Sequence, residues 1–258
     1  MGIAFGDVDS DALPDVFVSH LAQETHALWA QGPPGLFIDR TNQSGFVKSH
    51  WRGTCFGTLF GDFTNAGHFD LALANGSVFE QSHAGDPALG EFWSRYGQRN
   101  QLFSGDGFGH FADVSLDTPD FCGRDNVARA LAKGDFDKDG GLDLLVTTIA
   151  GKARLLRNIA ANRGHWLSIR ALDPAVNRDA FGAVIRVYAK DQLWLGWVHP
   201  AESYLSSSEP RAHFGLGKIN TIDRLEVTWP SGQREVFPGC SADQRIDIRK
   251  GEGKKDES

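Results

Sequence analysis

Short apolar runs alternate with acidic turns along the first 160 residues of the chain. Each run mixes small and aromatic residues, and each acidic turn leads into a further apolar run. The clearest case is residues 133–149, KGDFDKDGGLDLLVTTI, where residues 142–149 form a β-branched apolar segment after the turn. Short apolar segments bounded by turn residues are typical of β-strands. The pattern therefore predicts an all-β fold.

The acidic turns share one motif, which occurs three times. Residues 135–143 read D-x-D-x-D-G-x-x-D, and residues 7–15 carry the same four aspartates with Ala12 in the glycine position. Residues 62–70 keep the first and last aspartates, but Thr64 and Ala66 replace the two between them. Such self-similarity indicates one structural unit used repeatedly.

A second repeated element follows the first two turns. Residues 26–41 and 100–115 each place an apolar pair before a glycine-rich turn and a Phe-x-Asp sequence after it. This arrangement predicts a hairpin. Residues 152–158, KARLLRN, begin a third copy that breaks off.

The aspartate spacing predicts calcium sites. Carboxylates this close together repel one another unless a cation lies between them. Ca²⁺ takes about six to eight oxygen ligands from carboxylates and main-chain carbonyls. The motif is not an EF-hand, because Val146 stands where that loop needs a glutamate. The alternative is a solvated acidic turn. We expect two Ca²⁺ sites, with the loop from Asp62 to Asp70 weak or empty, and the ligands to be Asp7, Asp9, Asp11, Leu13 and Asp15 in one site and Asp135, Asp137, Asp139, Gly141 and Asp143 in the other.

Residues 164–250 lack the motif and carry evenly spaced strand patterns instead. Their lengths and spacing predict a small β-sandwich. Trp166 and Trp229 are the candidates for its core. The predicted strands are 165–172, 182–190, 193–199, 211–214, 222–229, 235–237 and 245–249.

These motifs resemble a known family. The turn motif with its hairpin resembles the FG-GAP or VCBS-type repeat of integrin α-chain-like β-propellers. The later blocks His213-Phe-Gly-Leu-Gly217 and Trp229-Pro-Ser-Gly232 resemble the ASPIC/UnbV domain, which follows such repeats in proteins similar to cartilage acidic protein. The resemblance implies a calcium-binding module for adhesion or ligand binding that is extracellular, periplasmic or at the cell surface.

The predicted organisation has three parts. Residues 1–160 form the repeat region, 161–250 the ASPIC/UnbV domain, and 251–258 a disordered tail. Residues 75–99 are an insertion between strands. A closed propeller needs at least about four blades, so the repeats predict only a partial one. We expect the exposed first blade to cause self-association, or the chain to be a fragment of a longer protein.

Charge and composition narrow the partners. The net charge is −7, and no stripe of Lys or Arg appears, which excludes a typical nucleic-acid-binding surface. No apolar run approaches the ~18 residues of a membrane span. Residues 1–7 leave no room for a signal peptide before the first motif. The resemblance then implies an unknown protein or carbohydrate ligand as the partner.

An enzymatic function is the main alternative. Propellers with similar metal loops sometimes host lyase or cyclase chemistry, with a metal ion as Lewis acid. A catalytic metal keeps a coordination position open toward a pocket, whereas a structural Ca²⁺ is closed by protein oxygens. The predicted ligands here are all local, which favours a structural ion, and no catalytic residue is predicted. A scaffold without a ligand is the third hypothesis.

Overall fold

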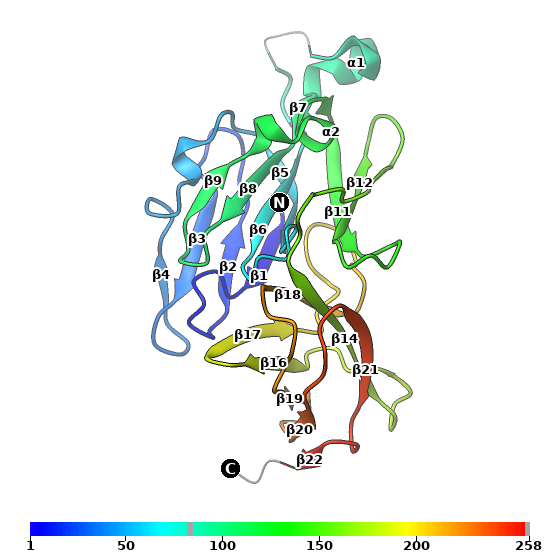
Figure 1. Ribbon diagram of the computed structural model, residues 1–258. Helices are drawn as coiled ribbons and strands as arrows, with labels where there is room; N and C mark the ends of the chain where they lie inside the picture. The colour runs from blue at the N-terminus through cyan, green and yellow to red at the C-terminus, as the bar shows by residue number, and fades with distance from the viewer. Residues whose placement is uncertain (82–84, 256–258) are drawn as a thin grey trace.

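The computed structural model describes residues 1–81 and 85–255 and is almost entirely β (Figure 1). Three sheets lie side by side in the N-terminal part, and a two-sheet unit packs against one end of them. This confirms the predicted all-β class, with a partial propeller followed by a small β-sandwich. In the described part, no helix is long and apolar enough to cross a membrane.

The three N-terminal sheets are antiparallel meanders built from the repeats. Their first strands meet at the centre, where β5 packs between β1 and β11. The third sheet has one strand fewer, as expected from the repeat that breaks off. The sheets comprise β1 (Ile3–Gly6), β2 (Asp15–Val18), β3 (Ala27–Gln31) and β4 (Phe37–Asp39); β5 (Cys55–Gly61), β6 (Asp70–Asn75), β8 (Gln101–Gly105) and β9 (Phe111–Asp113); and β11 (Ala128–Gly134), β12 (Asp143–Thr148) and β13 (Arg154–Leu156).

Two apolar cores hold these sheets together. The first lies between sheets one and two and is rich in aromatic side chains, including Phe17, Phe60 and Phe103. The second lies between sheets two and three and includes Ala72 and Leu131. All six residues of β6 are buried because the middle sheet is covered on both faces.

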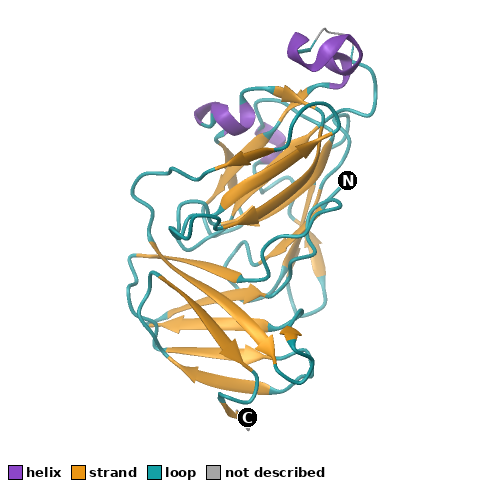
Figure 2. Cartoon of the chain, turned by 90° about the vertical axis from the view of Figure 1, so that its right-hand side faces the viewer, coloured by secondary structure: helices purple, strands orange, loops and turns teal. Residues whose placement is uncertain are grey.

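The insertion between β6 and β8 forms the end of the molecule farthest from the C-terminus (Figure 2). The expected excursion contains short helices and a two-residue strand that pairs with another; residues 82–84 of it lie outside the described residues. These elements are η2 (Pro87–Leu89), α1 (Gly90–Trp93), η3 (Ser94–Tyr96) and β7 (Gln98–Arg99), which pairs with β10 (Asp125–Asn126). The other short helices are η1 (Phe46–Lys48), η4 (Ser115–Asp117) and α2 (Pro119–Cys122).

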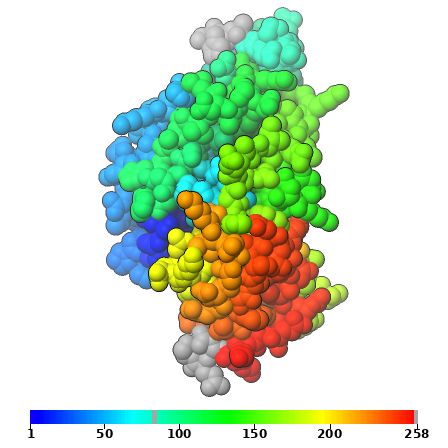
Figure 3. Space-filling view, viewed as in Figure 1, coloured from blue at the N-terminus to red at the C-terminus, as the bar shows by residue number. Residues whose placement is uncertain are grey.

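The C-terminal unit consists of two facing sheets around a core of its own (Figure 2). In Figure 3 its surface, yellow to red, forms the lower part of the molecule. Trp229 is 1% exposed in this core. One sheet contains β14 (His165–Asp173), β15 (Arg178–Asp179), β18 (Ala212–Gly217) and β21 (Gln244–Arg249), with β21 parallel to β14. The other contains β16 (Val184–Ala189), β17 (Gln192–Trp197), β19 (Arg224–Thr228), β20 (Arg234–Pro238) and β22 (Lys254–Lys255).

Two predictions about this unit are wrong. Trp166 is half-buried and lies outside the core, because its ring packs against the loop of the third sheet at Gly140. The tail does not fray from residue 251, since the Gly251 amide donates to the Glu235 carboxylate at 3.0 Å and β22 pairs with β20. Residues 256–258 of the predicted tail lie outside the described residues.

Candidate metal centres

The first aspartate of each acidic loop folds the loop around its own side chain. Its two carboxylate oxygens accept hydrogen bonds from the amides four and five residues further along the chain. The equivalent bonds are Asp11 and Ala12 to Asp7 at 3.2 and 3.0 Å, Ala66 and Gly67 to Asp62 at 2.9 and 2.7 Å, and Asp139 and Gly140 to Asp135 at 3.1 and 3.2 Å.

The last aspartate fastens each loop to a later segment. Asp15 is fully buried and accepts hydrogen bonds from the amides of Val8 at 2.8 Å and Gln31 at 2.9 Å. Asp143 accepts the corresponding bonds from Phe136 at 3.0 Å and Asn158 at 2.7 Å. The first and last aspartates of the motif therefore fix the backbone conformation of the loop through hydrogen bonds that do not require an ion.

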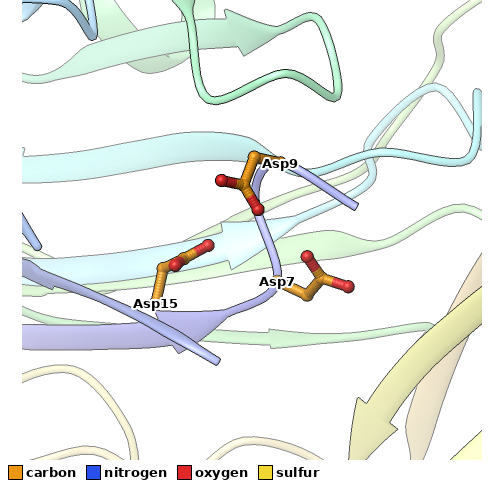
Figure 4. Close-up of side chains that lie close together, drawn as sticks. All are labelled: Asp7, Asp9 and Asp15. Atoms are coloured by element: carbon orange, nitrogen blue, oxygen red, sulfur yellow. The ribbon is translucent and has the colours of Figure 1, made fainter. Parts of the chain in front are cut away.

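The first loop gathers three of its four aspartates. Ligand oxygens of Asp7, Asp9 and Asp15 lie within 4.8 Å of one another, around the turn that joins β1 to β2 (Figure 4). The Asp9 Oδ1 atom is buried and, among the described residues, has no hydrogen-bond partner. A buried carboxylate oxygen without a partner is costly. A hard cation among the three carboxylates would satisfy it.

The carboxyl groups of this loop have raised pKa values. Burial raises the pKa of Asp7 to about 6 and that of Asp15 to about 7, although backbone hydrogen bonds oppose the shift. Burial and the neighbouring Asp11 charge also raise the pKa of Asp9. The protein alone therefore disfavours the fully ionised cluster, and a bound cation would reverse this.

The third loop gathers Asp135, Asp137 and Asp143, whose ligand oxygens also lie within 4.8 Å. Two arginines from the segment after β13, Arg157 and Arg163, form ion pairs with acids of this loop. Arg157 is paired with the Asp137 carboxylate, and its Nη2 lies 3.5 Å from Asp139. The first loop has no such ion pair among the described residues.

The third acid of each motif stands apart from these clusters. Asp11 accepts a hydrogen bond from the Leu13 amide at 2.8 Å, and Asp139 accepts one from the Gly141 amide at 2.8 Å. Arg163 also pairs with Asp139 at 2.8 Å. The structure thus brings together three predicted side-chain ligands per loop. The participation of Asp11, Asp139 and the carbonyls of Leu13 and Gly141 stays a prediction.

The middle loop has the same backbone shape with fewer acids. Asp62 and Asp70 are buried, and both are occupied by amide donors, as in the other two loops. No third carboxylate joins them in the described part of the chain. Its main chain instead contacts the C-terminal unit, since Thr64 O accepts from the Gly164 amide at 2.9 Å and Asn65 O from Gly217 at 2.8 Å.

The third loop is also a docking point, which the sequence did not reveal. The Gly140 carbonyl accepts hydrogen bonds from Asn65 Nδ2 at 3.0 Å and from His213 Nε2 at 3.1 Å. Arg245 Nη1 donates to the Asp135 carbonyl at 3.1 Å. The His213 ring stacks on Trp166, with ring centroids 6.4 Å apart. The C-terminal unit therefore sits directly on a predicted metal loop.

A cleft of about 1070 Å³ opens beside this junction. Asp139 is the one predicted metal ligand in its wall, and no described residue of the 75–99 insertion lines it. His165 and Asp243 both belong to the wall of this cleft, and His165 Nδ1 lies 2.6 Å from Asp243 Oδ2. The other polar or aromatic lining residues include Asn65, Arg163, Trp166 and Lys218.

Comparison with known proteins adds the family of the C-terminal unit. Residues 173–255 match the family model described as "ASPIC and UnbV". The chain carries an ASPIC and UnbV domain. The matched range ends at β22 and so includes residues first predicted to be a tail.

The chain is also similar to curated relatives over a wider range. It is 26% identical to cartilage acidic protein 1 of Xenopus tropicalis over 296 aligned residues, covering 95% of this chain and 43% of the relative. It is 37% identical to cartilage acidic protein 1 of Homo sapiens over 108 residues, covering 38% of this chain and 15% of the relative. The chain thus spans less than half the length of the relatives it matches.

Proposed function

We propose that the chain is a calcium-stabilised recognition module of an extracellular, periplasmic or cell-surface protein. The propeller-like sheets and the ASPIC and UnbV domain fit a recognition or adhesion module. Calcium binding rests mainly on one observation, the cluster of Asp7, Asp9 and Asp15 with a buried, unpartnered Asp9 oxygen. The second cluster, of Asp135, Asp137 and Asp143, supports it.

The proposed ions are structural. In each loop the first and last aspartates already accept amide hydrogen bonds, so the ion would neutralise a preformed acidic turn. The charge of the ion cancels the repulsion among the three carboxylates and replaces their lost hydration. In the third loop this also stabilises the segment on which His213 and Arg245 dock.

The recognition site that we propose is the cleft between the middle loop and the C-terminal unit. Its wall combines cationic, carboxylate and amide side chains with the aromatic side chain of Trp166. Such a mixed polar and aromatic surface suits a polar protein segment or a carbohydrate. Recovery of the native protein solely from the cytosolic fraction of its source would contradict the proposed localisation.

Thermal melting with and without calcium tests the proposal. Binding to the folded state adds about 2.7 kcal/mol at a ligand concentration of one hundred times Kd. Extracellular calcium modules have Kd values of about 10⁻⁴–10⁻³ M. The melts therefore cover CaCl₂ concentrations up to about 0.1 M, one hundred times the upper Kd, at constant ionic strength. We expect EDTA to lower the melting temperature and excess Ca²⁺ to restore it.

Three variants make the test site-specific. Asp9→Asn and Asp137→Asn each remove one anionic ligand, and we expect each to reduce the calcium-dependent rise in melting temperature. Asp191→Asn makes the same chemical change at an exposed position between β16 and β17 and should leave the rise intact. A calcium response that is absent in the wild type, or equal in all four proteins, would refute the assigned sites.

A further inference from the structure

The cleft beside the junction takes its wall from both parts of the molecule. Thr64, Asn65 and Ala66 of the middle loop supply one portion, and Lys218 and Asp243 of the C-terminal unit supply another. Two main-chain hydrogen bonds, of 2.9 and 2.8 Å, join the middle loop to the C-terminal unit at this place. A ligand in the cleft therefore contacts two parts of the chain that are already fastened to each other.

The formal charges in the cleft wall cancel. Among the described residues that line it, the charged side chains are two carboxylates, Asp139 and Asp243, and two cations, Arg163 and Lys218. Asp139 pairs with Arg163 at 2.8 Å, and Asp243 is held by His165 at 2.6 Å. A surface without net charge gives a highly charged ligand no long-range attraction. The wall therefore favours an uncharged polar ligand.

Two side-chain pairs place hydrogen-bond donors beside acceptors. The Arg163 side chain is 17% exposed and also donates to the Asn158 carbonyl at 2.8 Å, which fixes its orientation toward Asp139. The carboxylates of Asp139 and Asp243 remain 30% and 50% exposed, so both pairs still present polar atoms to the cleft. A hydroxyl group both donates and accepts a hydrogen bond. Adjacent hydroxyl groups of a sugar ring therefore match such a pair.

The cleft has an aromatic surface but little other apolar surface. Trp166 is half-buried in the wall, and His213 stacks on its ring at an interplanar angle of 6°, which holds the ring in place. The lining side chains of Leu216 and Ile219 pack with the core of the C-terminal unit. Protein segments bind mainly through apolar or aromatic anchors that fill pockets. A sugar needs only hydrogen bonds and one aromatic surface for its C–H groups, so it fits this wall better.

We propose that the cleft binds a neutral oligosaccharide. Adjacent hydroxyl groups of the sugar hydrogen-bond to the Arg163–Asp139 and His165–Asp243 pairs, and a sugar ring packs against the accessible part of Trp166. This ligand class narrows the recognition role proposed above for the cleft and depends on it. Because the wall comes from the middle loop and from the C-terminal unit, the bound sugar bridges these two parts.

A printed array of neutral and acidic glycans, followed by titration calorimetry with the neutral glycan that binds best, tests this ligand class. We expect the wild type to bind neutral glycans, with an affinity that hardly changes from about 0.05 to about 0.5 M NaCl, because salt screens only charged interactions. Asp243→Asn keeps the size of the side chain and suits the left-handed backbone there, with φ of +59°. It replaces one acceptor oxygen by a donor, and we expect it to weaken binding at least about tenfold.

Three further variants complete the test. His165→Ala removes the other half of the same pair and should weaken binding similarly. Asp117→Asn makes the acid-to-amide change at an exposed position in η4, outside the cleft, and should bind as the wild type does. Lys218→Ala removes a cation that has no ion pair in the described part of the chain, and it should leave neutral-glycan affinity within about twofold. A cooperative thermal melt verifies the fold of each variant.

The possible outcomes separate the ligand class from the recognition role. Binding to acidic glycans alone, lost in Lys218→Ala, would overturn the neutral sugar. Neutral-glycan binding that Asp243→Asn and His165→Ala leave unchanged would refute the cleft as its site. Capture of peptides but no glycan from a displayed random-peptide library, abolished by Asp243→Asn, would overturn the sugar and leave the recognition role intact. No binding on either the array or the library would contradict the recognition role as well.

Discussion

At the scale of single residues, His26 is held in its neutral form by the fold. Its side chain is buried, its ring packs edge-on against Phe17, and its Nδ1 accepts a hydrogen bond from the His20 amide at 3.0 Å. Burial lowers the pKa of His26 to about 4 from the usual 6.5. The unfolded chain therefore binds a proton between these two pH values while the folded chain does not, and the stability due to His26 is lost as the pH falls through this window.

We expect this loss to reach about 3 kcal/mol by pH 4. The measurement compares urea unfolding of the wild type and His26→Gln from pH 7.5 to 4.5. The wild type should lose stability relative to the variant on acidification. The loop aspartates are common to both proteins, so their titration cancels in the difference. His50→Gln, at an exposed histidine with no ion pair among the described residues, should follow the wild type. A pH-independent difference for His26→Gln would contradict the assignment.

The aspartate spacing predicted the three carboxylates that gather in each acid-rich loop, but it did not reveal that Asp11 and Asp139 stand apart, nor the ion pairs of the third loop. Asp137 and Asp139 meet Arg157, and Asp139 also meets Arg163. Both arginines come from the segment after β13, whose course depends on tertiary packing. The spacing of the motif contains no information on that course.

At the scale of elements, the three loops share a left-handed residue in the glycine position. Gly67 and Gly140 occupy it with φ of +101° and +84°, whereas the first loop has Ala12 at +65°. The left-handed conformation costs a non-glycine residue about 1–2 kcal/mol, and glycine costs about 0.4–1 kcal/mol through the unfolded state. We therefore expect Ala12→Gly to stabilise the protein by about 0.5–1 kcal/mol in chemical denaturation. A loss of stability would contradict this account.

The reverse change in the third loop should destabilise it. A Cβ on Gly140 would lie 2.0 Å from Trp166 Nε1, so Gly140→Ala adds a clash to the backbone strain, at about 1–3 kcal/mol. Gly232 has the same φ of +84° with open space around it. Gly232→Ala is therefore the control for backbone strain alone. Equal losses of stability in Gly140→Ala and Gly232→Ala would contradict the predicted clash with Trp166.

The strands of the C-terminal unit were predictable because each has a clear apolar pattern bounded by turns. The position of Trp166 was not. A tryptophan in a strand of a small sandwich suggests a core residue, but β14 also faces the acidic loops of the neighbouring sheets. The contact between two units is set by their relative placement, which a local pattern does not encode. The paired end at β22 was missed because residues 251–258, GEGKKDES, are polar and carry no apolar strand pattern.

At the scale of the whole molecule, the repeats predicted the number and order of the N-terminal sheets. They did not predict how the C-terminal unit packs against one end of these three sheets. That junction uses main-chain groups of the middle loop and side chains such as His213 and Arg245, whose partners in the other sheets the sequence does not specify. The middle loop has Thr64 and Ala66 at the two inner aspartate positions, and its main chain contacts the C-terminal unit at this junction.

Calcium stoichiometry tests the central claim most directly. Titration calorimetry of Ca²⁺ into chelator-treated protein counts the sites without relying on stability. We expect two ions per chain, bound at the loops that begin at Asp7 and Asp135, with weak binding or none at the loop from Asp62 to Asp70, where fewer anionic ligands are present. No binding up to about 10⁻² M, ten times the upper end of the extracellular range, or three equally tight sites, would contradict the account.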